Sequence, residues 1–360
     1  MKPYKVIISG GGTGGHLYPA LAIADEFKSR HKTADILFVG ALGRIEMAKV
    51  PKAGYRIIGL WIDGIQRSLS FRNLMFPVKL ILSLLKSIAI LLKFKPDVVV
   101  GTGGFASGPL LLMAGMFKIP TLIQEQNSYP GITNKLLSKT VKIIAVAYHG
   151  LERFFPKDKL NHTGNPIRKS IVDGKLNPTE AKAFFNQIAG KPTLVVLGGS
   201  LGARRINQLI AAQLETFEQK GIQLIWQCGS LYYDQYKKYQ SDRVKIMPFV
   251  AEMDQLYAAA DLIISRSGAA TLSELCCAAR PALLIPSPNV AENHQYLNAK
   301  ALADRGAALV ITEKELDQNF EAVFIQLFDS NKQQEMAKNL KKLAHPEATS
   351  KIVNLVEELL

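Results

Sequence analysis

The stretch from Tyr4 to Ala24, YKVIISGGGTGGHLYPALAIA, constrains the fold of this chain more than any other stretch. Val6, Ile7 and Ile8 form a short apolar run typical of a buried strand. Five glycines and a threonine follow, and apolar residues then recur at helical spacing. A glycine loop between a strand and a helix lets the backbone approach an anion, because the helix N-terminus presents free N–H groups and partial positive charge. The stretch therefore predicts an anion-binding loop in an α/β fold.

His16 lies at the mouth of this loop. Between Lys5 and Asp25 it is the only side chain of a type that gains and loses a proton near neutral pH. It is therefore a candidate general base. The residues alone leave the alternative open that it is a solvated or backbone-bonded loop histidine.

The length of the chain indicates how many domains it can form, and its net charge indicates what kind of partner it binds. A chain of 360 residues is long enough for two domains of ordinary size. Its formal net charge of +14 indicates an anionic partner, which could be a nucleic acid, phosphate groups or an acidic membrane surface. Three cysteines, at positions 228, 276 and 277, have no metal or redox spacing and read as reduced cytosolic thiols. The chain shows no room for a signal peptide and no apolar run of about 20 residues, so we expect a soluble or peripheral protein.

Short apolar runs followed by helical patterns recur along the chain, which favours parallel sheets covered by helices. A weak internal repeat relates the segment from Tyr4 to that from Pro192, and the segment from Pro96 to that from Ala260. Two doubly wound domains in tandem explain this repeat, with a join at Asn161–Pro166. The runs are Asp35–Gly40, Asp97–Gly101, Thr121–Ile123, Val141–Val146, Thr193–Gly198, Leu224–Cys228, Asp261–Ser265 and Ala282–Ile285.

The tail contains two helical patterns, Asn331–Ala344 and Glu347–Leu360, separated at Pro346. Because proline ends a helix, the last helix could turn back across the molecule.

The stretch from Gly64 to Pro96 is basic and has no acidic residue. Lys79, Lys86 and Lys93 form one stripe on the helix expected at Pro77–Phe94, whose other faces are almost entirely Leu and Ile. A sheet-covering helix with one solvated edge is the open alternative. Apolar residues among arginines in the preceding loop suit an anionic membrane surface. The expected membrane contact comprises Leu69, Phe71, Leu74, Met75, Phe76 and Lys79.

The glycines of the first loop satisfy the dinucleotide pattern GxGxxG, but that pattern is weak alone. The strand Ile36–Val39 lacks the acid that would hold a ribose, since the first acid beyond it is Glu46. NAD binding therefore loses most of its support, and no P-loop occurs.

Two further loops, Gly101–Gly104 and Gly198–Gly202, also follow apolar strands. Any one loop could be a tight turn, but three of them fit two diphosphate-bearing ligands that meet in a cleft.

The segment Ser267–Glu274, SGAATLSE, supplies the missing ribose acid. Small residues at the start of a helix can hold a diphosphate, and Glu274 can accept from ribose hydroxyls. The alternative is an exposed helix glutamate. The sequence contains no Asp-x-Asp, so a metal-bridged diphosphate lacks its usual ligands, and we expect neither a metal nor a cofactor.

Six motifs together resemble one family, the MurG-type N-acetylglucosaminyltransferases. They are GGGTGGHLYPALAIA, GTGGFASGP, EQNSYPGITNK, TGNPIR, GGSLGARRIN and RSGAATLSEL, in family order from residue 5 to about residue 300. The resemblance implies a GT-B fold, in which two Rossmann-like domains face each other across a cleft. Residues 1–163 would bind the acceptor and the membrane, residues 164–346 would bind the UDP-sugar, and the helix 347–360 would pack back on the first domain.

The resemblance also implies the reaction and the partners. The enzyme would transfer N-acetylglucosamine from UDP-N-acetylglucosamine to the C4 hydroxyl of the undecaprenyl-linked acceptor lipid I, giving lipid II with inversion. It would be a peripheral protein on the cytoplasmic face of the bacterial cell membrane, with no nucleic-acid partner.

Site roles follow residue by residue from the same resemblance. His16 would be the base, and Gly12, Gly103 and Gly104 would lie against the acceptor diphosphate. Gln295 would contact the sugar, although the family often has two adjacent glutamines where this chain has His294–Gln295. Arg168 and Ser200 would hold the UDP phosphates, and Val250 would present its backbone to uracil. The residues expected to bind UDP-N-acetylglucosamine are Thr13, Gly14, Gly15, Asn127, Arg168, Ser200, Val250, Ala269, Ala270, Thr271, Leu272, Ser273, Glu274 and Gln295.

The sequence leaves several alternatives open. Within the fold they are a glycosyltransferase with another lipid acceptor and a UDP-sugar epimerase. Outside it they are an NAD-dependent oxidoreductase and a nucleic-acid-binding protein. Basic residues beside apolar ones, without an aromatic-rich basic face, disfavour the last of these.

Overall fold

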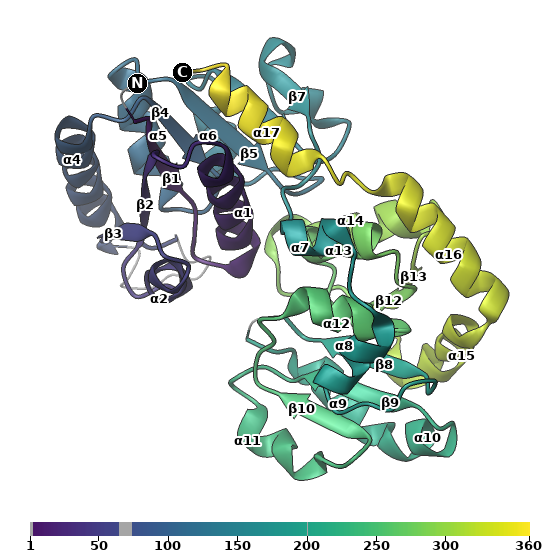
Figure 1. Ribbon diagram of the computed structural model, residues 1–360. Coiled ribbons are helices and arrows are strands. Elements are labelled where there is room, and N and C mark those ends of the chain that lie inside the picture. Colours follow the sequence, from purple (N-terminus) through teal and green to yellow (C-terminus); the bar gives the residue numbers. More distant parts are fainter. Residues whose placement is uncertain (1–2, 65–73, 200) are drawn as a thin grey trace. The chain divides into compact units, whose positions relative to one another are not determined.

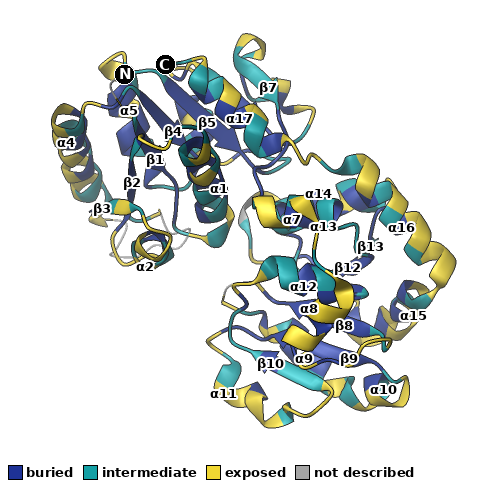
Figure 2. Cartoon of the chain, viewed as in Figure 1, coloured by how far each residue is buried: buried dark blue, intermediate teal, exposed yellow. Residues whose placement is uncertain are grey.

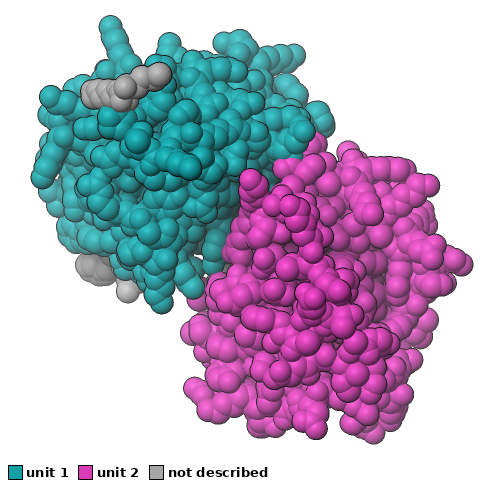
Figure 3. All heavy atoms as spheres, viewed as in Figure 1, with its two compact units in different colours: residues 1–167, 347–360 teal, residues 168–346 magenta. Residues whose placement is uncertain are grey.

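The computed structural model describes residues 3–64, 74–199 and 201–360. The chain forms two compact units (Figure 3). Unit 1 is Met1–Ile167 together with Glu347–Leu360, and unit 2 is Arg168–Pro346.

Unit 1 is built on a seven-stranded parallel sheet in the order β3-β2-β1-β4-β5-β6-β7 (Figure 1). The strands are β1 (Lys5–Ser9), β2 (Asp35–Ala41), β3 (Arg56–Leu60), β4 (Val98–Gly101), β5 (Thr121–Glu125), β6 (Ile143–Val146) and β7 (Leu160–His162). Central strands such as β4 and β5 are buried along their whole length, because helices cover both faces of the sheet (Figure 2). The helices are α1 (Gly14–Arg30), α2 (Ile45–Lys52), α4 (Phe76–Phe94), α5 (Ser107–Met116), α6 (Ile132–Leu137) and α17 (Ala348–Glu357).

Unit 2 repeats this plan on a six-stranded parallel sheet in the order β10-β9-β8-β11-β12-β13. The strands are β8 (Thr193–Leu197), β9 (Gln223–Gln227), β10 (Val244–Met247), β11 (Leu262–Ser265), β12 (Ala282–Leu284) and β13 (Leu309–Val310). The helices are α7 (Lys169–Asp173), α8 (Pro178–Phe184), α9 (Arg204–Ala212), α10 (Leu214–Gln219), α11 (Tyr233–Tyr236), α12 (Met253–Ala259), α13 (Ala269–Ala278), α14 (His294–Ala303), α15 (Leu316–Phe328) and α16 (Ser330–Leu343).

The two sheets share one strand order, which confirms the internal repeat and the doubly wound α/β class. Counted within each unit, six strands follow the order 3-2-1-4-5-6 of a Rossmann fold. In such a sheet the direction of winding reverses between strands 1 and 4, and ligands bind beyond the carboxyl ends of those strands. The first and second glycine loops follow β1 and β4, and the third loop and the SGAATLSE segment follow β8 and β11. The sequence motifs therefore occupy the reversal point of each unit.

The join between the units differs from the expected boundary after residue 163. Leu160–His162 is a strand of the first sheet, and Thr163 donates its N–H to the Val146 carbonyl at 3.0 Å. Asn165 Nδ2 then donates to the Gln126 carbonyl at 3.1 Å. These bonds hold the segment in unit 1, which ends at Ile167.

The C-terminal helix α17 belongs to unit 1, where it packs against α1 (Figure 1). Ile352, Val353 and Val356 are buried in the core beneath it. Glu357 accepts from Arg30 at 3.1 Å and contacts His31 Nε2 at 2.8 Å.

Helix α4 is apolar on its exposed side as well as on its buried side, where Ile90 and Leu91 lie in the core of unit 1 and Leu80 and Leu84 pack against it. Its buried side includes Ser83 and Ser87, whose hydroxyls donate to the carbonyls of Trp61 and Ser83. The opposite side is apolar and open to solvent, with Ile81 and Leu85 more than half exposed. The exposed apolar residues of this helix and the two positions before it are Leu74, Met75, Val78, Ile81, Leu82, Leu85 and Leu92, and we call this set the α4 apolar face. Within the described ranges, no helix is both long and apolar enough to cross a bilayer.

Candidate functional site

The first two glycine loops touch at the reversal point of unit 1. Strands β1 and β4 are neighbours there, with Ser9 opposite Gly101. Gly104 has a φ of +86°, and a side chain at this position would collide with the carbonyl oxygen of Gly11. Only glycine permits this approach, so the loops form one continuous backbone surface.

His16 lies in the first turn of α1, where its ring faces the second loop. Its Nδ1 is 3.0 Å from the Thr102 carbonyl oxygen and 3.0 Å from Gln126 Oε1. The Thr102 hydroxyl donates to the His16 carbonyl at 2.7 Å. A Cβ at Gly103 would lie 2.9 Å from Nδ1, so the loop leaves no room for a side chain there. The ring is therefore fixed by tertiary contacts, so His16 is not a fully solvated loop histidine. Its Nδ1 does bond to backbone, as the other half of that alternative expected, and the role of His16 as base stays a prediction.

The N-terminus of α1 has the features of an anion site. Thr13 is its N-cap residue but makes no side-chain cap, and the first turn contains no acid. The first-turn N–H groups of a helix lack intrahelical acceptors and point outward. This geometry favours the predicted binding of UDP-N-acetylglucosamine by Thr13, Gly14 and Gly15, which stays a prediction.

Glu46 anchors the first glycine loop through a hydrogen bond to its backbone. It is fully buried, and its Oε2 and Oε1 accept the N–H groups of Gly12 and Ala41, each at 2.9 Å. The glutamate beyond the second strand therefore binds the protein's own backbone rather than a ribose. Because Glu46 occupies the Gly12 N–H, Gly12 can shape the loop but cannot donate that N–H to an acceptor diphosphate.

Glu125 organises the segment that contains Asn127. Its buried carboxylate accepts from the backbone N–H of Asn127 at 3.0 Å, from that of Gly131 at 3.0 Å, and from Asn134 Nδ2 at 2.8 Å. Asn134 is itself buried, and its Oδ1 has no hydrogen-bond partner in the described structure. Since buried polar atoms are rarely left unpaired, Asn134 is a candidate ligand contact beside the predicted Asn127.

The start of α13 has the same features in unit 2. Gly268 is the N-cap residue, no side chain caps the helix, and the first turn lacks an acid. Gln295 lies beside it, because its carbonyl accepts from the Ser267 hydroxyl at 2.8 Å. Gln295 Oε1 accepts from the Ser287 N–H at 2.9 Å, which directs its donor Nε2 elsewhere. The helix begins with five of the predicted residues, Ala269, Ala270, Thr271, Leu272 and Ser273.

Glu274 is buried on α13, so the alternative of an exposed helix glutamate is wrong. Its Oε2 accepts from the Tyr257 hydroxyl at 2.9 Å. Burial raises the pKa of Glu274, while the positive charge of Arg168 and the Tyr257 hydrogen bond oppose that rise. Arg168 also donates to the Ala251 carbonyl at 3.1 Å. The structure thus brings together Arg168 and Glu274, which the sequence assigned separately to phosphate and ribose.

Two further donor-site residues have different outcomes. The N–H of buried Val250 donates to Gln227 Oε1 at 2.9 Å, so only its carbonyl can face a uracil. Ser200 lies outside the described residues.

The predicted membrane contact was a set of exposed apolar side chains together with the cation Lys79, and the structure agrees with only part of it. Leu74 and Met75 are exposed and Phe76 is half-buried, whereas Leu69 and Phe71 lie outside the described residues. The expectation for Lys79 as a surface cation is wrong, because its side chain is only 13% exposed and pairs with Asp63 at 2.5 Å.

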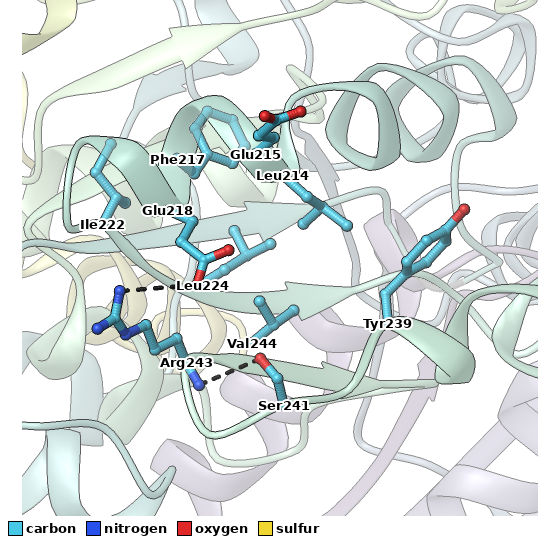
Figure 4. Close-up of a pocket in the computed structure, with 10 residues that line it drawn as sticks. All are labelled: Leu214, Glu215, Phe217, Glu218, Ile222, Leu224, Tyr239, Ser241, Arg243 and Val244. Atoms are coloured by element: carbon cyan, nitrogen blue, oxygen red, sulfur yellow. Dashed lines mark hydrogen bonds and ion pairs between the residues drawn. The ribbon is translucent and has the colours of Figure 1, made fainter.

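A pocket of about 250 Å³ in unit 2 is separate from these loops (Figure 4). It lies between α10 and the first residues of strands β9 and β10, where Leu224 pairs with Val244. Glu218 and Arg243 form a 3.9 Å ion pair on its wall. The glycine loops follow the opposite, carboxyl ends of the strands, so this pocket contributes nothing to the site.

The class of protein follows from the site and from the match to family models. Residues 6–146 match the glycosyltransferase family 28 N-terminal domain, and residues 193–352 match the C-terminal domain of the same family. The two Rossmann-like units with glycine loops at their reversal points are therefore those of a GT-B glycosyltransferase.

Three relatives identify the family within that class. All three are named UDP-N-acetylglucosamine--N-acetylmuramyl-(pentapeptide) pyrophosphoryl-undecaprenol N-acetylglucosamine transferase. The relative from Christiangramia forsetii is 56% identical over 99% of this chain and 98% of its own length. Those from Flavobacterium psychrophilum and Cytophaga hutchinsonii are 54% and 51% identical, each over 100% of this chain and 98% of its own length. The chain belongs to this MurG family of N-acetylglucosaminyltransferases.

Solved structures agree on the fold. Acinetobacter baumannii MurG superposes with a TM-score of 0.75 at 27% identity, covering 99% of this chain and 100% of that chain. A UDP-N-acetylglucosamine 2-epimerase superposes with a TM-score of 0.64 at 15% identity, covering 99% and 96%. The second likeness shows a shared fold alone.

Proposed function

We propose that this chain transfers N-acetylglucosamine from UDP-N-acetylglucosamine to the C4 hydroxyl of N-acetylmuramoyl-pentapeptide diphospho-undecaprenol, lipid I, and so makes lipid II. The observation that carries the chemistry is the fixed imidazole of His16 beside the two glycine loops of unit 1. A base at this position is what an acceptor hydroxyl requires before it can attack a sugar.

The reaction is a single displacement with inversion. His16 takes the proton from the C4 hydroxyl as that oxygen bonds to C1 of the donor sugar. The bond from C1 to the diphosphate oxygen breaks on the opposite face, and UDP leaves with the electron pair.

Unit 2 supplies what the leaving group needs. The uncapped, acid-free start of α13 supports diphosphate binding at its N–H groups, and Arg168 adds a positive charge close to Glu274. Glu274 accepts from the ribose hydroxyls, and Gln295 donates its Nε2 to the sugar.

The α4 apolar face supports membrane attachment, which the acceptor's C55 tail requires. Its exposed apolar side chains lie on a protein with a net charge of +14, a combination that suits a surface of anionic lipids. The three cysteines are all unpaired, which supports a location on the reducing, cytoplasmic side of the bacterial membrane. No nucleic acid takes part.

The experiment is to incubate the purified protein with UDP-N-acetylglucosamine and a lipid I analogue and to detect the disaccharide by mass spectrometry. We expect a product that depends on both substrates. Conversion of UDP-N-acetylglucosamine without an acceptor would instead favour the epimerase alternative.

A further inference from the structure

Among the residues that the structure describes, the ring of His16 meets only hydrogen-bond acceptors at its Nδ1. One is the Thr102 carbonyl oxygen, and the other is Gln126 Oε1, each at 3.0 Å. A carbonyl oxygen cannot donate a hydrogen bond, so the contact with Thr102 already requires a proton on Nδ1.

The amide of Gln126 has only one orientation that satisfies its neighbours. Its Nε2, which has two hydrogens, lies within hydrogen-bond distance of three acceptors: the Thr102 carbonyl at 2.7 Å, the Gln124 carbonyl at 3.2 Å, and Gln124 Oε1. A flipped amide would place an oxygen against three other oxygens. Oε1 must therefore face His16 and accept from Nδ1.

The amides of Gln124 and Asn165 fix this orientation in turn. Gln124 presents Oε1 to Gln126 because its own Nε2 donates to Asn165 Oδ1 at 3.0 Å. Asn165 presents Oδ1 because its Nδ2 donates to the Gln126 backbone carbonyl, which can only accept. The three side chains are between 0% and 3% exposed, so water does not compete for these bonds. We call Asn165, Gln124 and Gln126 the amide chain.

We propose that the amide chain is a positioning device that holds neutral His16 in the tautomer with hydrogen on Nδ1. This inference rests on the proposed function for its purpose, since that tautomer leaves the lone pair on Nε2 for the proton of the acceptor hydroxyl. The opposite tautomer carries hydrogen on Nε2 and cannot act there as a base. Gln126 is thus a positioning residue that acts through His16 and does not touch the substrate.

The direct test is the ¹⁵N NMR spectrum of histidine-labelled protein at a pH where the imidazoles are neutral, because the two ring nitrogens have distinct shifts when protonated and unprotonated. The chain has six histidines, and the His16→Asn variant identifies the signals of His16. We expect protonated Nδ1 and unprotonated Nε2. Protonated Nε2 in the native protein would overturn the proposal, whatever the protein's activity.

The Gln126→Leu variant measures the contribution of the amide chain. It removes one of two acceptors at Nδ1, so we expect the tautomer ratio to shift toward Nε2–H by about 2- to 10-fold, the effect of one neutral hydrogen bond. The kcat should fall by no more than the same factor, and the KM for UDP-N-acetylglucosamine should not change. An unchanged tautomer ratio in the folded variant would overturn the role of Gln126.

Gln223→Leu is the matched control. Gln223 is also a fully buried glutamine with two hydrogen bonds to backbone, to the N–H and the carbonyl of Ile188, but it belongs to unit 2. We expect this variant to lose stability without altering the His16 signals. If the native tautomer is as proposed and yet no disaccharide forms, the proposed function fails while the positioning of His16 stands.

Discussion

Replacing Glu274 by alanine should weaken UDP binding strongly. The Tyr257 hydroxyl donates to the Oε2 of this carboxylate, so Oε1 is the oxygen proposed to accept from the ribose. A hydrogen bond from a ribose hydroxyl to a charged group contributes about 1.5–3 kcal/mol. We therefore expect the Kd for UDP in Glu274→Ala to rise by about 12- to 150-fold, measured by isothermal titration calorimetry.

The pH dependence of a second variant, Glu274→Gln, adds an independent readout. Burial raises the pKa of Glu274 above its ordinary value of 4.5. The carboxyl of Glu274 therefore keeps its proton to a higher pH in the folded state than in the unfolded state. The free energy of unfolding of the native protein should fall as the pH rises from about 4.5 to above the raised pKa of the folded state. Glutamine cannot ionise, so the ligand-free variant should gain stability relative to the native protein across that rise, even though it binds UDP more weakly.

Tyr257→Phe is the control for these effects. It removes the donor to Oε2 and should raise the pKa of Glu274 further, but it leaves Oε1 for the ribose. Its effect on UDP affinity should be smaller than that of Glu274→Ala. Unchanged UDP affinity in folded Glu274→Ala would refute the ribose role of this residue.

Four further predictions can be checked separately. His16→Ala should lower kcat by about 10²–10⁴-fold with little change in the KM for UDP-N-acetylglucosamine. Asparagine at position 16 can still donate a hydrogen bond but cannot take up a proton, so a near-normal kcat in His16→Asn would show that His16 is not the base. The double variant Ile81→Ser/Leu85→Ser should bind anionic liposomes less but UDP equally, whereas Ile325→Ser on α15, with a similar exposure of 56%, should bind liposomes as the native protein does. Glu46→Ala leaves the buried N–H of Ala41 and the part-buried N–H of Gly12 without their acceptor. It should cost about 1–3 kcal/mol of unfolding free energy for the buried group and less for the other, and an unaltered denaturation midpoint would count against its role in holding the loop. Because the sequence has no Asp-x-Asp, transfer should persist in excess EDTA; loss of turnover that magnesium restores would contradict this expectation.

The sequence predicted the centre of each sheet but not its edges. Every central strand coincides with an expected apolar run, and the unexpected strands are the four outermost ones, β3, β7, β10 and β13. Central strands are buried on both faces and read as continuous apolar runs. An edge strand such as β7, Leu160–His162, is only half-buried and contains polar residues, so a local pattern does not distinguish it from a loop.

The site was predictable where it depends on local backbone and not where it depends on tertiary contacts. Glycine loops and helix starts are properties of contiguous sequence, so His16 and the residues of α13 could be proposed from the sequence. Gln126 and Glu46 were missed, because their roles come from contacts with residues far away in the chain. Gln126 did lie in a quoted motif, EQNSYPGITNK, and its place one residue before Asn127 was the available signal. Lys79 was misjudged because its partner Asp63 lies just before the basic stretch.

The central claim is an inverting transfer of N-acetylglucosamine to a lipid-linked acceptor. The measurement that tests it most directly uses UDP-N-acetylglucosamine labelled with ¹³C at C1, together with a lipid I analogue, and follows the labelled carbon by NMR. We expect this carbon to become β-linked to O4 of the N-acetylmuramoyl residue as UDP is released. An α-linked product, or a donor that is epimerised or left unchanged in the presence of the acceptor, would contradict it.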